Sequence, residues 1–389
     1  MIRAKILRIL LFLSFTTLVI GPLGMIPIDI PGVNIYLADI VLLLMIVVWI
    51  MNIFPLINLL KKEGILFSVL PFMSIALFSL IFSPIILTLQ EKAIAFLYFI
   101  RFVCYFFYYI TVVYLLKLKI LKKSEIIHGL TISGLLLATF GWLQYFFYPD
   151  LRNLFYLGWD PHYKRIFGSY LDANYLGIIL TLTLTLLFIK YKSKAGIWLA
   201  RFGIFLTLMF TYSRSSYLAL TVAGIIYLFA KGKVNLLKYL ILVIFVSALI
   251  LPRPSGESVK LERVFSLEQR LINWEQGFRI LSQYPLVGIG FNTVRFAKFQ
   301  YGYLESDYMT NHAGAGFDNS FLFVGVTTGL IGLAGFIYFL GKIYQRGGLL
   351  TKITLGSIIV HSLFLNTLFW PWVLQWLMLI TAIDVKDDK

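Results

Sequence analysis

Residues 318–341 read DNSFLFVGVTTGLIGLAGFIYFLG, and Asp318 is the only charged residue in this stretch. At a rise of 1.5 Å per residue, a helix over these residues is long enough to cross about 30 Å of hydrocarbon. Further apolar runs follow one another along the rest of the chain. The sequence therefore predicts an all-α integral membrane protein with about twelve transmembrane helices, at residues 6–28, 36–60, 65–87, 93–116, 126–147, 172–190, 195–211, 214–230, 236–251, 318–341, 350–368 and 370–384.

The composition supports the membrane assignment. Of the 389 residues, 60% are hydrophobic and 13% are charged, whereas soluble domains have about 45–50% and about 25%. An aromatic content of 17% excludes a disordered chain. The single cysteine, Cys104, lies within an apolar run, which excludes a disulfide scaffold and a cysteine-based metal cluster.

The net charge of +16 indicates how the chain is oriented in the membrane. Basic residues near membrane spans concentrate on the cytoplasmic side. We therefore predict one polytopic domain over residues 1–389, with both termini in the cytoplasm and two long external loops at 148–171 and 252–317. The basic residues that share the predicted cytoplasmic side are Arg3, Lys5, Arg8, Lys61, Lys62, Lys117, Lys119, Lys122, Lys123, Lys190, Lys192, Lys194, Lys231, Lys233, Lys238, Lys342, Arg346, Lys352, Lys386 and Lys389.

The loop at 252–317, between the ninth and tenth predicted spans, is predicted to be partly helical. Residues 266–285 read SLEQRLINWEQGFRILSQYP, in which Ser266 and Gln269 have the spacing of a capping box. Leu271, Trp274 and Phe278 belong to an apolar stripe at helical spacing. An amphipathic helix on the external side is expected to lie on the bundle or at the membrane interface.

Arginines predicted on the external side do not follow the rule that basic residues near spans lie on the cytoplasmic side. They therefore need a separate explanation. Arg214 lies in a very short external turn, where it either extends to lipid headgroups or binds an anionic substrate group. Arg165 precedes the sixth span and either pairs with Asp172 or binds substrate. Arg270 has no acidic residue at helical pairing distance in sequence, whereas Arg279 follows Glu275 by four residues. We therefore favour Arg270 over Arg279 as a substrate ligand.

Two further residues have structural as well as functional explanations. Arg101 lies inside the fourth predicted span, where an ionised side chain normally faces a cavity or pairs with a polar group. Asn174 stands at the start of the sixth span, where it either contributes to binding or caps the helix.

The candidate general bases on the external side are His312 and Asp318. Histidine accepts protons near neutral pH, and burial of Asp318 would raise its pKa into a useful range. Asp318 has a second explanation as the N-cap of the tenth span. Other titratable residues expected on this side are Asp160, His162, Asp172, Glu305 and Asp307.

Signals for metal ions, cofactors and nucleic acid are weak. Glu305 and Asp307 form one acidic pair, and the first external loop has no such pair. We therefore predict no metal and no cofactor. The basic residues mostly flank the cytoplasmic ends of spans, so nucleic acid is not an expected partner.

Several short motifs, in order, resemble the O-antigen ligase and O-antigen polymerase superfamily. They are Arg165-x-x-Gly168 with Asn174 following, Ser213-Arg214, Arg270-x-x-x-Trp274, Pro285-x-x-Gly288-Ile289-Gly290, and Asp318-Asn319 followed by nine residues, Gly329, two residues and Gly332. The ligases have a histidine where this chain has Asp318. The resemblance implies that Asn319 belongs to the site. Because Asp318 replaces the histidine of the ligases, the general base is either His312 or Asp318.

The resemblance implies a glycosyltransferase of the GT-C type in the bacterial cytoplasmic membrane. It would transfer a glycan from undecaprenyl diphosphate, without metal and with inversion, to a glycan, lipid A-core or protein acceptor on the external face. Arg165, Arg214 and Arg270 would hold the diphosphate. A multi-pass transporter or a lipid-linked glycan flippase is the alternative function, because twelve spans with external arginines suit either class.

Overall fold

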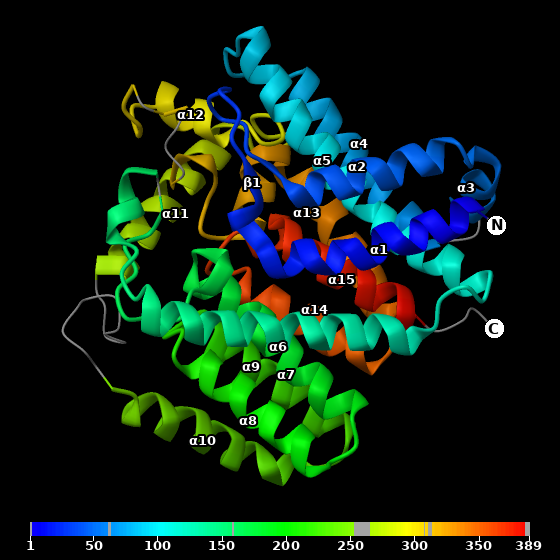
Figure 1. Cartoon of the computed structure of the whole chain (residues 1–389). Helices are drawn as coiled ribbons and strands as arrows, with labels where there is room; N and C mark the ends of the chain where they lie inside the picture. The colour runs from blue at the N-terminus through cyan, green and yellow to red at the C-terminus, as the bar shows by residue number, and fades with distance from the viewer. Residues whose placement is uncertain are drawn as a thin grey trace.

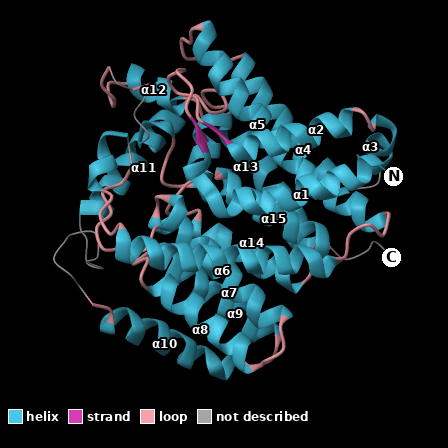
Figure 2. Cartoon of the chain, viewed as in Figure 1, coloured by secondary structure: helices cyan, strands magenta, loops and turns pink. Residues whose placement is uncertain are grey.

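The computed structural model describes residues 2–60, 64–157, 159–252, 265–306, 308–309 and 313–385 (Figure 1). About three quarters of the chain is helical, and the described residues include one short antiparallel hairpin of β1 (Met25–Ile26) and β2 (Ile35–Tyr36) (Figure 2). The α-helices are α1 (Ile2–Ile20), α2 (Leu37–Ile50), α3 (Ile53–Leu60), α4 (Gly64–Ile81), α5 (Leu89–Lys117), α6 (Lys123–Phe147), α7 (Ala173–Lys190), α8 (Ala195–Met209), α9 (Arg214–Ala230), α10 (Leu237–Ile250), α11 (Phe265–Gln283), α12 (Val294–Gln300), α13 (Ser320–Arg346), α14 (Leu349–His361) and α15 (Pro371–Asp384). Short 3-10 helices are η1 (Gly21–Gly24), η2 (Arg152–Leu157), η3 (Gly168–Tyr170), η4 (Val234–Leu236), η6 (Ala313–Ala315) and η7 (Thr367–Phe369).

The helices confirm an all-α membrane protein. Six helical segments among the described residues are long and apolar enough to cross a membrane, at Ile2–Gly24, Gly64–Ile81, Leu89–Lys117, Lys123–Phe147, Ala173–Lys190 and Ser320–Arg346. Six shorter apolar helices lie at Leu37–Ile50, Ala195–Met209, Arg214–Ala230, Val234–Ile250, Leu349–His361 and Pro371–Asp384. The number of twelve spans remains a prediction, because the shorter helices do not reach the length of a full crossing.

Several helix boundaries differ from the predicted ones: α4 ends at Ile81 instead of residue 87, and α14 ends at His361 instead of residue 368. The first helix ends at Ile20 instead of continuing to residue 28, because Gly21 adopts a φ of +59° and turns the chain toward the hairpin. The second predicted span is divided into α2 and α3. There the Asn52 side chain donates to the Val48 carbonyl oxygen at 2.9 Å, and Pro55 has no N–H to continue the helical ladder.

The packing of the helices brings distant parts of the sequence together. Helix α13 packs against α4, α14 against α9, and α15 against α5. Helices α6, α7, α8 and α9 are neighbours, and α10 lies at their outer edge (Figure 1). Helix α11 packs against α13 and so lies on the bundle, as one of the two predicted placements required.

The segment 285–290, which follows α11, forms backbone hydrogen bonds with an unwound turn of α13. The Ile289 N–H donates to the Val326 carbonyl oxygen at 3.0 Å, and the Leu330 N–H donates to the Pro285 carbonyl oxygen at 2.8 Å. An interrupted helix leaves backbone groups without intrahelical partners, and in a membrane protein these need protein partners. The segment 285–290 supplies such partners to α13.

Two glycines allow this close approach. Gly329 has a φ of +65° inside α13, and a Cβ atom on it would lie 2.1 Å from the Leu286 carbonyl oxygen. Gly288 has a φ of +74°, and a Cβ atom on it would lie 2.5 Å from the carbonyl carbon of Thr327. Both positions combine left-handed backbone with backbone contact, which together require glycine.

The residue after this segment anchors it in the core. The ring of Phe291 lies among aromatic rings from α4, α5 and α13, with its centroid 6.2 Å from those of Phe72 and Phe102 and 5.9 Å from that of Phe323. Phe72 is fully buried. The chain that connects α11 to α13 is therefore part of the bundle core.

Candidate functional site

Arg165 is held in the loop that precedes α7 with only 2% of its surface exposed. Its Nε donates to the Thr211 carbonyl oxygen at 2.7 Å, and its Nη1 lies 3.4 Å from His162 Nδ1. Its Nη2 is buried and has no hydrogen-bond partner among the described residues. Burial lowers the pKa of Arg165 to about 10. A buried guanidinium with an unused donor is well suited to bind an anion.

The backbone around Arg165 is fixed from two sides. Gln144, near the end of α6, accepts from the Phe167 N–H at 2.9 Å and donates to the Arg165 carbonyl oxygen at 3.2 Å. The Ile166 N–H donates to the Phe210 carbonyl oxygen at 3.0 Å. Because these contacts hold the backbone from Arg165 to Phe167, the fold itself sets the position of Arg165.

Asp160, His162 and Asp172 form a cluster of titratable groups next to Arg165, with their ligand atoms within 4.8 Å of one another. Asp172 is the N-cap of α7 and accepts from the Asn174 N–H at 2.6 Å. Burial and the charge of Asp160 raise the pKa of Asp172 to about 6, although backbone donors and Arg165 oppose this rise.

This cluster has oxygen and nitrogen ligands of the kind that bind divalent cations, and the sequence analysis did not group its members. The guanidinium of Arg165 lies beside His162, however, and its positive charge disfavours a cation there. We therefore assign these residues to the charge network that surrounds Arg165.

Arg214 is the first residue of α9, directly after the turn that Arg165 contacts. Ser213 caps the helix by accepting from the Ser216 N–H, and Tyr212 adopts a φ of +51° to close the turn. Arg214 is half-buried. A guanidinium at a helix N-terminus adds its charge to the positive end of the helix dipole, and both favour a bound anion.

Arg270 lies on α11, one turn before two residues that hold the chain at Asp318. The Asn273 side chain accepts from the Asp318 N–H at 3.0 Å, and Trp274 Nε1 donates to the Asp318 carbonyl oxygen at 3.3 Å. These contacts explain the Arg-x-x-x-Trp motif, because the tryptophan fixes the helix that presents the arginine.

The structure brings the three predicted phosphate-binding arginines together. The charge of Arg270 reaches Arg214 and also contributes to lowering the pKa of Arg165. We call Arg165, Arg214 and Arg270 the arginine cluster. They come from three separate segments, and like charges at one place are costly without a compensating anion.

Asp318 faces this cluster from the start of α13. Burial raises the pKa of Asp318, and the charges of Arg270 and Lys298 oppose that rise. The N-cap of α13 is Asn319, whose Oδ1 accepts from the Phe321 N–H at 2.9 Å. The capping explanation for Asp318 is therefore wrong.

The N-cap of α7 is likewise different from the predicted one. Asp172 provides it, so the capping explanation for Asn174 is also wrong. His312, the other candidate base, lies outside the described residues.

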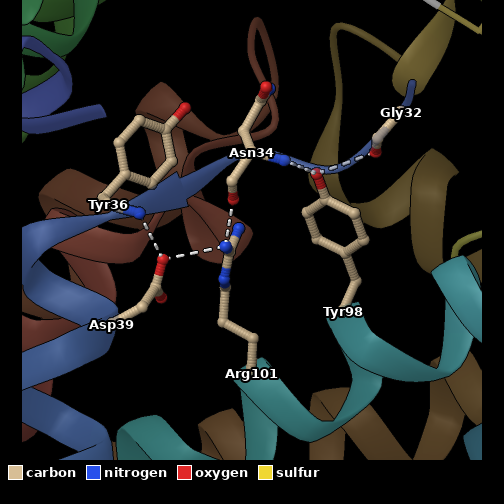
Figure 3. A network of polar contacts seen from close by, with 6 residues as sticks. All are labelled: Gly32, Asn34, Tyr36, Asp39, Tyr98 and Arg101. Atoms are coloured by element: carbon tan, nitrogen blue, oxygen red, sulfur yellow. Dashed lines mark hydrogen bonds and ion pairs between the residues drawn. The ribbon is translucent and has the colours of Figure 1, made fainter. Parts of the chain in front are cut away.

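Arg101 and Arg279 both form ion pairs. Arg101 Nη2 lies 2.8 Å from Asp39 Oδ2 and also donates to the Asn34 carbonyl oxygen (Figure 3). Arg279 pairs with Glu275 at 2.6 Å, and both side chains are exposed. Arg101 therefore links α5 to the start of α2, whereas Arg279 lies on the exposed side of α11.

Sequence analysis missed His361, which is fully buried at the end of α14. Its Nδ1 lies 2.7 Å from Thr367 Oγ1, and its Nε2 lies 3.3 Å from Ser216 Oγ. Ser216 Oγ in turn lies 2.9 Å from Ser213 Oγ, in the turn that carries Arg214. The only signal in the sequence is one imidazole within an apolar run, which does not reveal that α14 packs on α9.

Comparison with known protein families supports the motif assignment. Residues 199–337 match the family model described as O-antigen ligase. The O-antigen ligase and polymerase superfamily is therefore the one that this part of the chain resembles. No curated protein matches the sequence.

The O-antigen ligase match includes Arg214, Arg270 and Asp318, as well as the segment 285–290 and the unwound turn of α13. Arg165 lies before it, and the fold adds this residue to the site through its bond to Thr211. The match supports glycan transfer in a membrane as the kind of function this protein performs.

Proposed function

We propose that this protein transfers a glycan from undecaprenyl diphosphate to an acceptor hydroxyl on the external face of the bacterial cytoplasmic membrane. The observation that carries this proposal is the convergence of Arg165, Arg214 and Arg270 from three segments. A diphosphate leaving group gains negative charge as the glycosidic bond breaks. Fixed positive groups at that place stabilise the transition state more than the ground state.

The reaction is a single displacement at the anomeric carbon. The base takes the proton of the acceptor hydroxyl, and the acceptor oxygen forms the new bond on the face opposite the diphosphate. The bond between the anomeric carbon and the phosphate oxygen breaks, and its electron pair leaves with the diphosphate. This geometry inverts the anomeric configuration.

The base is Asp318 or His312. Burial raises the pKa of Asp318, which makes its carboxylate a stronger base than an exposed one. Its place beside Arg270 also puts the proton acceptor close to the proposed leaving-group site. No metal is required in this mechanism, because the arginine cluster supplies the positive charge.

The proposal is tested by a gel assay of the purified protein in lipid. A fluorescent glycan repeat on undecaprenyl diphosphate is added with EDTA and no other acceptor. A ladder of longer lipid-linked glycans identifies a polymerase, and we expect Arg214→Ala to abolish it. Arg152→Gln is the matched control, because Arg152 is exposed and pairs with Asp150 within its own loop. We expect it to retain the ladder.

Without a ladder, lipid A-core and protein acceptors are tested in turn, and transfer to one of them identifies a ligase or a protein glycosyltransferase. Full transfer by a correctly inserted Arg214→Ala variant would contradict the diphosphate assignment. Activity that EDTA removes and Mg²⁺ or Mn²⁺ restores would instead implicate Asp160, His162 and Asp172 in metal binding. Substrate movement driven by an ion gradient, without a new glycosidic bond, would identify a transporter or flippase.

A further inference from the structure

A cavity of about 240 Å³ lies between the β1–β2 hairpin, α5, α12 and the connection from α14 to α15. None of the arginine cluster lines it, nor does Asp318. Its wall combines charged, amide and aromatic groups, among them Arg101, Arg295, Tyr105, Asn366, Trp370 and Trp372. This mixture differs from a lipid-facing groove, which is lined by apolar side chains.

One side of the cavity is fixed and electrically neutral. The charge of Arg101 is matched by Asp39, and the Tyr98 hydroxyl donates to the Gly32 carbonyl oxygen at 3.2 Å (Figure 3). Tyr98 also accepts from the Asn34 N–H at 3.3 Å. These contacts hold the turn of the hairpin against α5, so the fold itself forms this wall.

The opposite side carries one positive charge that has no acidic partner among the residues that the structure describes. Arg295, on α12, is half-buried and donates to the carbonyl oxygen of Met309. Burial lowers its pKa. It forms no ion pair within the part of the chain that the structure describes, and none of the residues that line the cavity there is acidic. A partly buried charge is stabilised by an opposite charge, so one anionic group fits this wall.

Two buried polar atoms also lack hydrogen-bond partners in the described part of the chain. The Tyr105 hydroxyl and Asn366 Oδ1 form no hydrogen bond with any described residue, and both residues line the cavity. Buried polar atoms are costly when they are left unpaired, so a ligand with hydroxyl groups would satisfy them. Trp370 and Trp372, whose ring centroids are 4.7 Å apart, add flat apolar surface. Together these groups match a polar ring that also has apolar faces.

We propose that this cavity binds one carboxylate-bearing sugar of the uronic acid class. A single carboxylate matches the one charge, that of Arg295, which no described acidic residue neutralises, whereas a diphosphate carries more charge than this wall offers. The volume is below the roughly 300–1,000 Å³ of pockets for drug-sized ligands, which suits one sugar ring.

The position of the cavity suggests what this sugar does. Trp370 stacks on Tyr175 with a centroid distance of 4.1 Å, and the Tyr175 N–H donates to Asp172 in the charge network. Ala315 lines the cavity three residues before Asp318. The sugar would thus be held next to the proposed base. Its assignment as a unit of the acceptor glycan rests on the proposed function, whereas its binding does not.

The test measures equilibrium binding to the full-length protein in nanodiscs. The probes are methyl glucuronide, methyl glucoside and glycerol 3-phosphate, which represents a phospholipid headgroup. We expect the glucuronide to bind at least about tenfold more tightly than the glucoside, since a hydrogen bond to a charged group has about that effect. Arg295→Gln should remove this preference. Arg279→Gln, an exposed arginine of the same predicted loop, should retain it.

Asn366→Asp is a second variant that keeps the size of the side chain and adds a negative charge. We expect it to weaken glucuronide binding at least about tenfold, which keeps the test informative if Arg295→Gln does not fold. Equal binding of glucuronide and glucoside, or an unchanged preference in Arg295→Gln, would overturn the proposal. Stronger binding of glycerol 3-phosphate than of glucuronide would also overturn it, in favour of a lipid headgroup.

The two proposals fail in different ways. Glucuronide binding that depends on Arg295, in a protein that transfers no glycan to any acceptor, would retain the cavity assignment and remove the proposed function. Glycan transfer by a protein that does not bind glucuronide would retain the proposed function and remove the cavity assignment.

Discussion

Arg165 and Thr211 are 46 residues apart in sequence, and the Nε of Arg165 donates to the Thr211 carbonyl oxygen at 2.7 Å. This bond joins the loop before α7 to the turn before α9. Arg214 follows Thr211 by three residues, so the bond fixes one arginine of the cluster relative to another. Repulsion between these charges is thus overcome by folding before substrate arrives, which reduces the cost of ordering the site on binding.

Arg165→Lys tests whether the guanidinium itself is needed. Lysine keeps the charge, but its donors all lie on one compact ammonium, so it cannot reproduce the planar fork in which one guanidinium nitrogen bonds to Thr211 and another reaches an anion. We expect glycan transfer to fall at least about tenfold, with a smaller effect on folding than Arg165→Ala. Initial rates and thermal melting of the purified variants measure both. Equal rates for wild type and Arg165→Lys would show that only the charge matters.

The pH dependence of transfer tests Asp318 as the base. A carboxylate base is active when deprotonated, so the rate should rise with pH through the raised pKa of Asp318. Asp318→Asn should remove this rise and lower the rate by roughly 10²–10⁴-fold, the usual contribution of a general base.

The same profile tests His312 as the base. If His312 accepts the proton, the rise should be centred near the ordinary histidine pKa of about 6.5. It should then persist in Asp318→Asn and disappear in His312→Ala. Rate profiles of the two variants, measured in one lipid composition, separate these outcomes.

Asp172 should make the stability of the fold depend on pH. Its pKa is about 6 in the folded protein, against about 3.9 in an unfolded chain. The folded state binds the proton more tightly, so this contribution to stability is complete below about pH 4 and is lost as the pH rises through about 6.

Asp172→Asn retains an N-cap residue and does not titrate. Relative to wild type, we expect the variant to gain stability as the pH rises over this range, by on the order of 1–3 kcal/mol at neutral pH. Melting temperatures across the pH range measure the difference. A constant difference would show that Asp172 keeps the same charge throughout.

Gly329→Ala should destabilise the bundle severely. The new Cβ would lie 2.1 Å from the Leu286 carbonyl oxygen, on backbone with a φ of +65°. We expect a loss of more than about 3 kcal/mol, visible as a low yield of folded protein and an earlier melting transition. Gly341→Ala is the matched control in α13, since no described atom lies within 4 Å of its added Cβ. It should be neutral or stabilising by up to about 1 kcal/mol.

The sequence identified the three arginines of the cluster because each contradicted the distribution of charge around the spans. Their convergence was not visible, since Arg165, Arg214 and Arg270 belong to segments that only the packed bundle brings together. Their role as phosphate ligands remains a prediction. Composition and hydropathy were sufficient for the fold class, because a membrane-spanning helix requires a long apolar run.

The details that were wrong depend on single side chains. Asn319 and Asp172 cap their helices instead of the neighbours Asp318 and Asn174, and residues so similar in capping preference cannot be ranked by sequence. Hydropathy also continues across Gly21, where the backbone turns, so α1 was predicted to be too long. His361 was missed because its partners, Ser216 and Thr367, become neighbours only when α14 packs against α9.

The backbone contact between the segment 285–290 and α13 has a consequence for how such proteins diverge. The Leu330 N–H donates to the Pro285 carbonyl oxygen, and Gly329 lies against Leu286, so the segment and the helix form one contact surface in which each needs the other. Recombination between related genes would preserve this contact surface only if both crossovers fall outside it, one before α11 and the other after the unwound turn of α13. Helix α11, the segment 285–290 and the first half of α13 are therefore expected to be inherited as one block.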